Sequence, residues 1–374
     1  MKIVVTGAGG LLGGHVAARV HAANCMAAFK GQTEPYELVM IDHHSFNNDT
    51  TLANALSDAH AVLHMAGVNR APAAIIEEAN PKIARRLSTA CAKCGIRPHI
   101  IYANSTHAVS DTPYGRSKKI AGEILSEIGG RYTDLVLPHI FGEGARPHYN
   151  NVTATFIEAV VTGETPQINP KGQVSLLHAG EAAQIAIDAV TAGHCGTLFP
   201  ISRVIPVPEL FSMLKGFQRN YVANIFPDLQ DPFNVAMFNT YRAALYPDGF
   251  PRPLKLNTDV RGTLFEVAKG GGGGQCFASW TEPGATRGDH FHLSKVERFL
   301  VIQGEAIIRM RRVLDGQVWE FPVTGDAPAA VDIPTLYTHS IENVGKAPLL
   351  TLFWTHDFFD PTAPDTYLDP VLEA

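Results

Sequence analysis

Three histidines and a glutamate are the side chains in this sequence best suited to hold a metal ion. Residues 284–304 read G-x5-H-x-H-x4-E-x6-G, which places His290, His292 and Glu297 at fixed spacing. Residues two apart on a β-strand leave the same face, so the first two imidazoles point together. Glu297 opens the next apolar run, and His339 farther along the chain supplies a third imidazole. Nitrogen and carboxylate ligands of this kind predict a divalent metal, with zinc as the first candidate.

A serine, a tyrosine and a lysine form a second group that could do chemistry. Ser105 ends an apolar run typical of a strand, and Tyr114 and Lys118 lie one helical turn apart at the start of a predicted helix. The lysine charge favours the phenolate and lowers the tyrosine pKa. The tyrosine would protonate a carbonyl oxygen as hydride arrives, and the serine would bond to the same oxygen. We therefore predict these three as catalytic residues of a carbonyl reduction.

Glycines near the N-terminus predict a dinucleotide site. Residues 2–5 are typical of a strand, and an apolar-periodic helix begins close to residue 12. Glycines between such elements allow a tight turn and let backbone N–H groups approach a pyrophosphate at the positive end of the helix. The predicted cofactor-binding residues are those of this turn and the small residues after a later strand: Gly7, Gly10, Leu11, Leu12, Gly13, Ala66 and Gly67.

The end of the second predicted strand bears on the choice of cofactor. Asp42 stands there, and an acid at this place accepts hydrogen bonds from the adenosine ribose and disfavours a 2′-phosphate. The adjacent His43 and His44 could instead face that phosphate. These residues leave NADH and NADPH open.

The bulk composition excludes several classes of protein. The chain has 374 residues, of which 45% are hydrophobic and 18% charged, as expected for a globular protein of two or three domains. A net charge of −6 argues against a nucleic-acid surface. No apolar run reaches membrane-spanning length, and the N-terminus leads directly into a strand rather than a signal peptide. Five cysteines without framework spacing predict free thiols in a reducing cytoplasm.

We expect two domains. Residues 1–250 predict an α/β Rossmann-type fold with a doubly wound parallel sheet, and residues 251–374 predict an all-β barrel. Pro251-Arg-Pro-Leu is typical of a linker, and the glycine run 270–274 is interpreted as a loop of the barrel.

Along essentially its full length the chain resembles the CapF (WbjC) family of bifunctional capsular-polysaccharide enzymes. The two metal-ligand stretches match the two halves of a cupin motif, a jelly-roll barrel signature. The other matching segments are Ala66-Gly-Val-Asn-Arg70, Pro113-Tyr-Gly-Arg-Ser-Lys118, Tyr149–Phe156, Asp259–Glu266 and Phe359–Tyr367. The resemblance implies an extended short-chain dehydrogenase/reductase (SDR) domain fused to a metal-binding cupin.

The same resemblance implies a pair of reactions. The substrate would be a UDP-linked 4-keto-6-deoxy-N-acetylhexosamine on the route to UDP-N-acetyl-L-fucosamine. The cupin would epimerise C3, and the SDR domain would reduce the C4 ketone with NADPH. Ser105, Tyr114 and Lys118 match the reductase triad, and His290, His292, Glu297 and His339 match the zinc site. A homodimer or higher homo-oligomer is the expected assembly. The alternative is an SDR reductase whose cupin serves only as a structural or dimerisation module.

Four further residues are expected to face the substrate: Arg70, His139, Asn150 and Asn151. One of the two asparagines has an equal alternative, because it would also serve as a helix cap. The chain departs from the family pattern at Asp42, where basic character is usual, and at His139, where an asparagine is usual. Leu336 replaces a glycine before His339 and would be strained if that position needs a positive φ.

Overall fold

The computed structural model describes residues 1–270 and 272–372, and the chain divides into two compact units. Unit 1 contains Met1–Thr155 and Ile168–Pro208, and unit 2 contains Phe156–Gln167 and Glu209–Ala374. Gly271, in the middle of the predicted glycine loop, lies outside the described residues. The rest of that run joins two strands of unit 2.

Unit 1 is built on a six-stranded parallel sheet in the order β2-β1-β3-β4-β5-β8. The chain leaves β1 toward β2 on one side and later toward β3 on the other, so the sheet has a switch point where ligands of such folds bind. The predicted Rossmann-type fold is confirmed. The strands are β1 (Lys2–Thr6), β2 (Glu37–Ile41), β3 (Ala61–His64), β4 (His99–Ser105), β5 (Tyr132–Leu137) and β8 (Gly196–Leu198).

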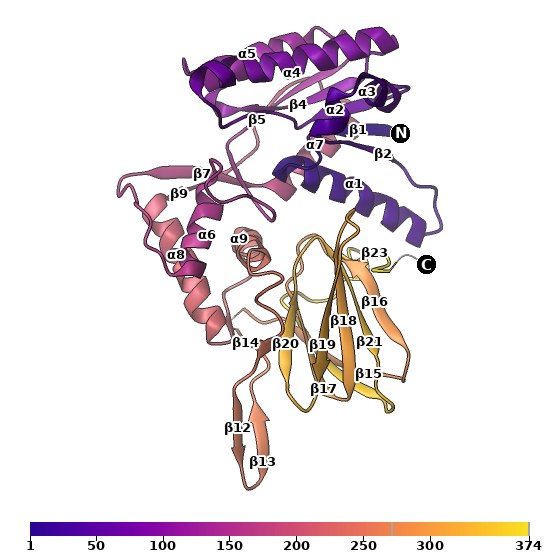
Figure 1. Cartoon of the computed structure of the whole chain (residues 1–374), viewed down its shortest axis with the longest axis vertical. Coiled ribbons are helices and arrows are strands. Elements are labelled where there is room, and N and C mark those ends of the chain that lie inside the picture. Colours follow the sequence, from indigo (N-terminus) through magenta and orange to yellow (C-terminus); the bar gives the residue numbers. More distant parts are fainter. Residues whose placement is uncertain (271, 373–374) are drawn as a thin grey trace. The chain divides into compact units, whose positions relative to one another are not determined.

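Helices cover both faces of this sheet (Figure 1). Val16 and Val20 of α1 (Leu11–Phe29) and Ile187 of α7 (Ala179–Thr191) are buried against one face. The other core takes buried leucines from α3 (Asp49–Leu56), α4 (Ala73–Cys94) and α5 (Pro113–Ser126). The remaining elements of the N-terminal half are α2 (His43–Asn47), the 3-10 helix η1 (Thr106–Val109), α6 (Val152–Thr162) and the small sheet of β6 (His139–Phe141), β7 (Gln173–His178) and β9 (Arg203–Pro206).

Unit 2 contains two five-stranded antiparallel sheets, β11-β20-β17-β22-β15 and β19-β18-β21-β16-β23 (Figure 1). Apolar side chains such as Phe299, Ile308 and Phe353 form one buried core. The predicted all-β barrel is confirmed. The strands are β11 (Arg252–Pro253), β15 (Gln275–Thr281), β16 (Thr286–Phe291), β17 (Glu297–Gln303), β18 (Glu305–Arg312), β19 (Val318–Thr324), β20 (Ala329–Ile333), β21 (Tyr337–Asn343), β22 (Leu349–Thr355) and β23 (Tyr367–Leu368); a hairpin of β12 (Leu256–Asp259) and β13 (Gly262–Phe265) and the short pair β10 (Ile225–Phe226) and β14 (Lys269–Gly270) complete the set.

Two helices before residue 251 belong to the barrel unit: α8 (Val207–Val222), from Glu209 onward, and α9 (Pro232–Ala243). The Tyr221 hydroxyl of α8 donates to Asp332, whose other carboxylate oxygen lies 2.5 Å from Nε of Arg298. Arg242 of α9 donates to the Ile333 carbonyl at 3.2 Å. This grouping differs from the predicted boundary between residues 250 and 251, because buried side chains of both helices bond to barrel strand β20.

No helix in the part of the chain that the structure describes is long and apolar enough to cross a membrane.

Candidate active sites

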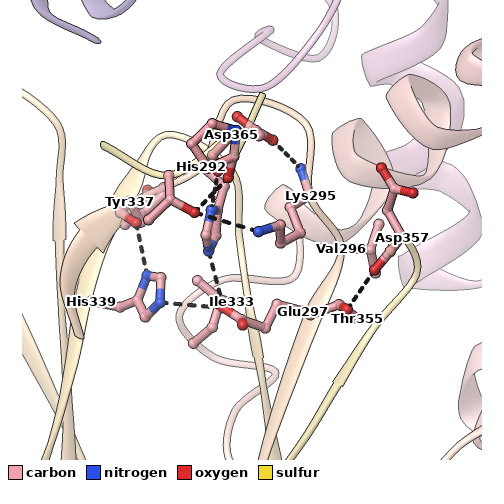
Figure 2. Close-up of polar contacts among 12 residues, drawn as sticks. His292, Lys295, Val296, Glu297, Ile333, Tyr337, His339, Thr355, Asp357 and Asp365 are labelled. Atoms are coloured by element: carbon pink, nitrogen blue, oxygen red, sulfur yellow. Dashed lines mark hydrogen bonds and ion pairs between the residues drawn. The ribbon is translucent and has the colours of Figure 1, made fainter. Parts of the chain in front are cut away.

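The predicted metal ligands come together inside the barrel. His290 is on β16, His292 follows that strand, Glu297 begins β17 and His339 is on β21. One ligand atom from each residue lies within 4.8 Å of those of the others, and all but His290 are buried. Figure 2 shows the carboxylate of Glu297 between the rings of His292 and His339. The structure therefore brings together the four residues that the sequence predicted as ligands.

Backbone carbonyls determine which ring nitrogen of two histidines faces the carboxylate. Nδ1 of His292 lies 2.5 Å from the carbonyl oxygen of Asp365, and Nδ1 of His339 lies 3.4 Å from that of Tyr337. A carbonyl only accepts, so Nδ1 of each ring carries a proton, and Nε2 of each ring faces Glu297.

The spacing of the ring nitrogens and the carboxylate makes the cluster suited to a cation. Nε2 of His292 lies 3.1 Å, and Nε2 of His339 3.3 Å, from the same oxygen Oε2 of Glu297. The Nε2 atom of His339 is buried without a hydrogen bond of good geometry among the described residues. Ligand atoms about 2.0–2.2 Å from a tetrahedral zinc ion are separated by about 3.4 Å. The donor set and its spacing fit a divalent metal.

The charge states of the ligands agree with this fit. Burial, together with the neighbouring His339 and His292, lowers the pKa of His290 to about 3. Burial also lowers the pKa of His339. Burial by itself would raise the pKa of Glu297, but the imidazoles of His292 and His339 hold it well below its usual value. Neutral imidazoles and an ionised carboxylate are the forms that bind metals.

Leu336 adopts the conformation that the missing glycine would provide. Its φ is +64°, a left-handed conformation that is costly for a side chain with a Cβ atom. Its N–H donates to the His292 carbonyl at 3.0 Å, and its carbonyl accepts from Val313 at 3.0 Å. The loop before His339 thus keeps the left-handed conformation at this position, although a leucine is strained there.

The predicted catalytic residues lie at the end of the parallel sheet in unit 1. Ser105 ends β4, and Tyr114 and Lys118 are on the first two turns of α5. Burial raises the pKa of Tyr114, and a hydrogen bond with Ser105 opposes that rise. The expected net lowering by Lys118 is therefore wrong for this arrangement. The lysine Nζ instead donates to the Ala103 carbonyl at 2.5 Å and lies 4.2 Å from the centroid of the Tyr102 ring.

Lys118 is buried, and burial lowers its pKa to about 7. Close to it lies Asn80 of α4, which the sequence analysis missed. Asn80 donates to the Ser117 hydroxyl at 2.9 Å and exchanges hydrogen bonds with both backbone groups of Val68, at 2.8 and 3.0 Å. It therefore ties α5 to the segment after β3. Its only sequence signal is a polar residue on the apolar face of a helix.

The predicted cofactor loop lies against the segment after β3. Gly7 has φ +73°, and a Cβ atom there would lie 2.7 Å from the backbone nitrogen of Ala66. A Cβ atom on Gly13 would lie 2.1 Å from the Gly7 carbonyl, so both positions require glycine. Gly10 donates to the Gly7 carbonyl at 2.9 Å, and Leu11 and Leu12 begin α1. A Cβ atom on Gly67 would lie 3.9 Å from Nζ of Lys118, so the loop and the triad are neighbours.

Asp42 and His43 are exposed at the end of β2. The Asp42 carboxylate caps α2 by accepting from the Ser45 N–H at 2.7 Å, and this hydrogen bond lowers the pKa of the carboxyl. His43 lies in the first turn of the same helix.

The four predicted substrate residues differ in how they are engaged. Nε2 of His139 is buried without a hydrogen-bond partner in residues 1–270 and 272–372, whereas Arg70 is exposed. Asn150 is exposed and donates to the Asn69 carbonyl. Asn151 is the helix cap: Oδ1 accepts from Ala154 and Nδ2 donates to Ile140, both at 3.0 Å. These bonds favour the capping alternative for Asn151, and its substrate role stays a prediction.

A second histidine–glutamate group in unit 1 has a different character. One ligand atom from each of His15, Glu143 and His178 lies within 4.8 Å of the others, and all three residues are buried. His15 Nε2 lies 3.1 Å from the Glu143 carbonyl, and His178 Nε2 lies 2.9 Å from its carboxylate. Ring N–H donors on acceptors account for these contacts, so the group ties α1 to the loop after β6.

Comparison with known proteins agrees with both halves of the fold. Residues 3–199 match the NAD dependent epimerase/dehydratase family, and residues 257–367 match the polysaccharide biosynthesis C-terminal domain. The chain belongs to the NAD dependent epimerase/dehydratase family.

Within that family the predicted resemblance to CapF-like proteins is confirmed. The chain is 29% identical to the UDP-2-acetamido-2,6-beta-L-arabino-hexul-4-ose reductase of Pseudomonas aeruginosa, with 100% of both chains covered. The crystal structure of the capsular polysaccharide assembling protein CapF from Staphylococcus aureus is 28% identical, covers 99% of this chain and 100% of its own, and has a TM-score of 0.57. A UDP-N-acetylglucosamine 4-epimerase from Methanobrevibacter ruminantium, 17% identical over 65% of this chain and 98% of its own, shares the fold with a TM-score of 0.52.

Proposed function

We propose that the chain is a bifunctional enzyme that acts on a UDP-linked 4-keto-6-deoxy-N-acetylhexosamine. The barrel would invert C3 beside the ketone, and the Rossmann-type unit would reduce the C4 ketone with NADPH, giving a precursor of UDP-N-acetyl-L-fucosamine for a capsule or O-antigen. The observation that carries the proposal is the presence of two preformed sites in one chain: the Ser105–Tyr114–Lys118 group and the four-ligand cluster around Glu297.

In the reductase site each residue has a separate task. Tyr114 would give its phenolic proton to O4 while hydride reaches C4 from a reduced nicotinamide held along the Gly7–Gly13 loop. Ser105 would donate a second hydrogen bond to the same oxygen. Lys118, buried beside Gly67, would reach the nicotinamide ribose. The buried and unpaired Nε2 of His139 offers a hydrogen bond to the sugar.

In the barrel the four ligands would hold a divalent metal. The C3 proton is acidic only if the enolate is stabilised, and a bound metal supplies that stabilisation as a Lewis acid. A base then takes the proton from one face of C3, and an acid returns one on the other face. His290 is the least buried of the ligands, so it lies on the side of the cluster that a substrate would reach.

We propose NADPH as the reductant. NADH is the alternative, because an acid at position 42 disfavours a 2′-phosphate. The Asp42 carboxylate is already bonded to the Ser45 N–H at 2.7 Å. It is therefore less available to the adenosine ribose than a free acid would be. The exposed His43 beside it would face a 2′-phosphate. Initial rates with each reduced nicotinamide would decide between the two.

Two variants separate the two reactions. Tyr114→Phe should lower the reduction rate by about 10²–10⁴-fold, because the proton donor is lost. The same variant should still exchange the C3 hydrogen in deuterated water, as followed by NMR without nicotinamide. Glu297→Gln should have the opposite effect. It should abolish exchange of the C3 hydrogen, but it should still oxidise the reduced nicotinamide when the substrate supplied is already epimerised. A Tyr114→Phe variant with normal reduction, or wild-type protein without exchange when metal is supplied, would overturn the corresponding half.

The burial of three ligands also favours a second candidate, a reductase whose barrel holds a structural metal. Structural zinc sites are closed, whereas catalytic sites keep an open position. Under this candidate, His290→Ala leaves the stereochemistry and rate of the product unchanged. The bifunctional enzyme instead gives a product that is not inverted at C3, which NMR of the product distinguishes.

A further inference from the structure

The loop Leu293–Val296 joins two of the proposed metal ligands, His292 and Glu297. It is not part of a strand, so its conformation depends on bonds to other segments. At its far end, the Val296 N–H donates to Nδ1 of His356 at 3.0 Å. In its middle, the Ser294 carbonyl accepts from Asn239 at 2.7 Å. Its beginning is held by a residue more than seventy positions away, in the C-terminal segment.

That residue is Asp365, which binds the start of the loop with its carboxylate. Oδ1 accepts from the Leu293 N–H at 2.9 Å. Oδ2 accepts from the Ser294 N–H and Oγ at 3.0 and 2.8 Å and from the Lys295 N–H at 3.0 Å. Three successive N–H groups converging on one anion form a backbone nest, and bonds to an ionised acceptor are stronger than neutral ones. Figure 2 shows Asp365 above His292 with its contact to Lys295.

The backbone of the same residue acts directly on a proposed ligand. Its carbonyl oxygen accepts from Nδ1 of His292 at 2.5 Å, which leaves Nε2 of that ring to face Glu297. A partner of this kind determines the tautomer and the direction of a ligating histidine. Asp365 therefore controls the ring by its carbonyl and the following loop by its carboxylate.

The segment that carries Asp365 is attached to a ligand strand as well. Two residues later, β23 pairs with β16, so that Tyr367 lies opposite Phe291 and Leu368 opposite His290. The rings of Phe291 and Tyr367 stack with centroids 5.2 Å apart. Asp365 itself has φ +28°, a conformation that persists only when surrounding contacts impose it. The segment around Asp365 therefore contacts the strand that carries His290 directly.

We infer that Asp365 is the positioning residue of the barrel metal site. It does not coordinate the ion; it holds the His292 ring and the connection to Glu297 in the geometry that binds it. This inference rests on the proposed metal site. Loss of such a partner lowers metal affinity by about 10–100-fold.

The test measures zinc affinity of the full-length protein by competition with a chromophoric chelator. Asp365→Ala should weaken binding by about 10–100-fold, and Asp365→Asn, which keeps an oxygen acceptor, by less. Asp360→Ala is the matched control, because the Asp360 carboxylate lies in the same segment and accepts from the N–H and hydroxyl of Thr362. It should bind zinc as the wild type does. The visible spectrum of the cobalt form should change in Asp365→Ala and not in the control.

The outcomes separate this inference from the proposed function. If wild-type protein binds no zinc, the proposed metal site fails. If wild type binds and both Asp365 variants bind equally well with unchanged cobalt spectra, the metal site stands and the positioning role is overturned. Should Asp365→Ala not fold, the comparison of Asp365→Asn with Asp360→Asn decides in the same way. A purely structural role would lower thermal stability in the metal-free protein without changing zinc affinity.

Discussion

At position 336 a glycine variant should be more stable than an alanine variant, which reverses the usual order of stability. The residue is 5% exposed, and its backbone is bonded on both sides, to His292 and to Val313, with φ at +64°. The chain therefore cannot relax out of the left-handed conformation. Leu336→Ala and Leu336→Gly both lose the buried side chain, at a cost of about 2–5 kcal/mol. Only the alanine variant keeps the strain.

The difference between the two variants follows from two opposing effects. A left-handed residue with a Cβ atom costs about 1–2 kcal/mol, which glycine avoids. Glycine in turn loses about 0.5–1 kcal/mol more backbone entropy on folding than alanine does. The glycine variant should thus be more stable than the alanine variant by about 0.5–1 kcal/mol. At an ordinary buried position the order is the opposite.

Tryptophan fluorescence can follow the unfolding of the relevant unit. The chain has 3 tryptophans, at positions 280, 319 and 354, and all of them lie in unit 2. Urea titrations of metal-free protein would give the free energy of unfolding for each variant. Leu300, which is buried in the middle of β17, provides the control. Leu300→Ala should have a larger free energy of unfolding than Leu300→Gly. If Leu336→Ala is also more stable than Leu336→Gly, the strain argument is refuted.

Three further predictions concern metal, protons and acid stability. Zinc at about 100 times its dissociation constant should raise the free energy of unfolding of unit 2 by about 2.7 kcal/mol, and Glu297→Gln should remove this effect in the same fluorescence assay. Lys118, with its pKa lowered to about 7, should titrate near neutrality in NMR of lysine-labelled protein. Burial lowers the pKa of His64 to about 3, so only the unfolded chain takes up its proton between about pH 6.5 and 3. Stability should therefore fall as the pH falls through this range, by about 2 kcal/mol at pH 5 from this group, and His64→Asn should flatten the slope of unfolding free energy against pH.

Residues whose positions follow from local periodicity could be predicted from the sequence. The two-residue spacing of His290 and His292, at the end of β16, predicted that both enter one site, and four positions along a helix place Tyr114 and Lys118 on one face. The glycine at position 7 was predictable for the same reason, since a strand-to-helix turn this tight needs its positive φ.

Residues that act across the chain could not be predicted in this way. Asp365 reaches His292 through coil, and Asn80 reaches Ser117 across two helices, so no spacing rule connects either pair. The pKa of Tyr114 does not follow from its spacing to Lys118, because burial, which only the folded chain defines, raises it. The bond from Asn151 to the Ile140 carbonyl joins two elements, and no local spacing predicts it.

The path of the chain through its two units constrains how the protein can be divided. It enters the barrel unit at Phe156, returns to the first unit at Ile168 and leaves it again after Pro208. No single cleavage point therefore yields two intact pieces. A fragment starting at residue 251 would lack Tyr221, and the Arg298–Asp332 ion pair would lose part of its buried shell. Genetic fusion, or exchange of one unit for a relative's unit, must therefore carry both crossing segments together with the unit they belong to.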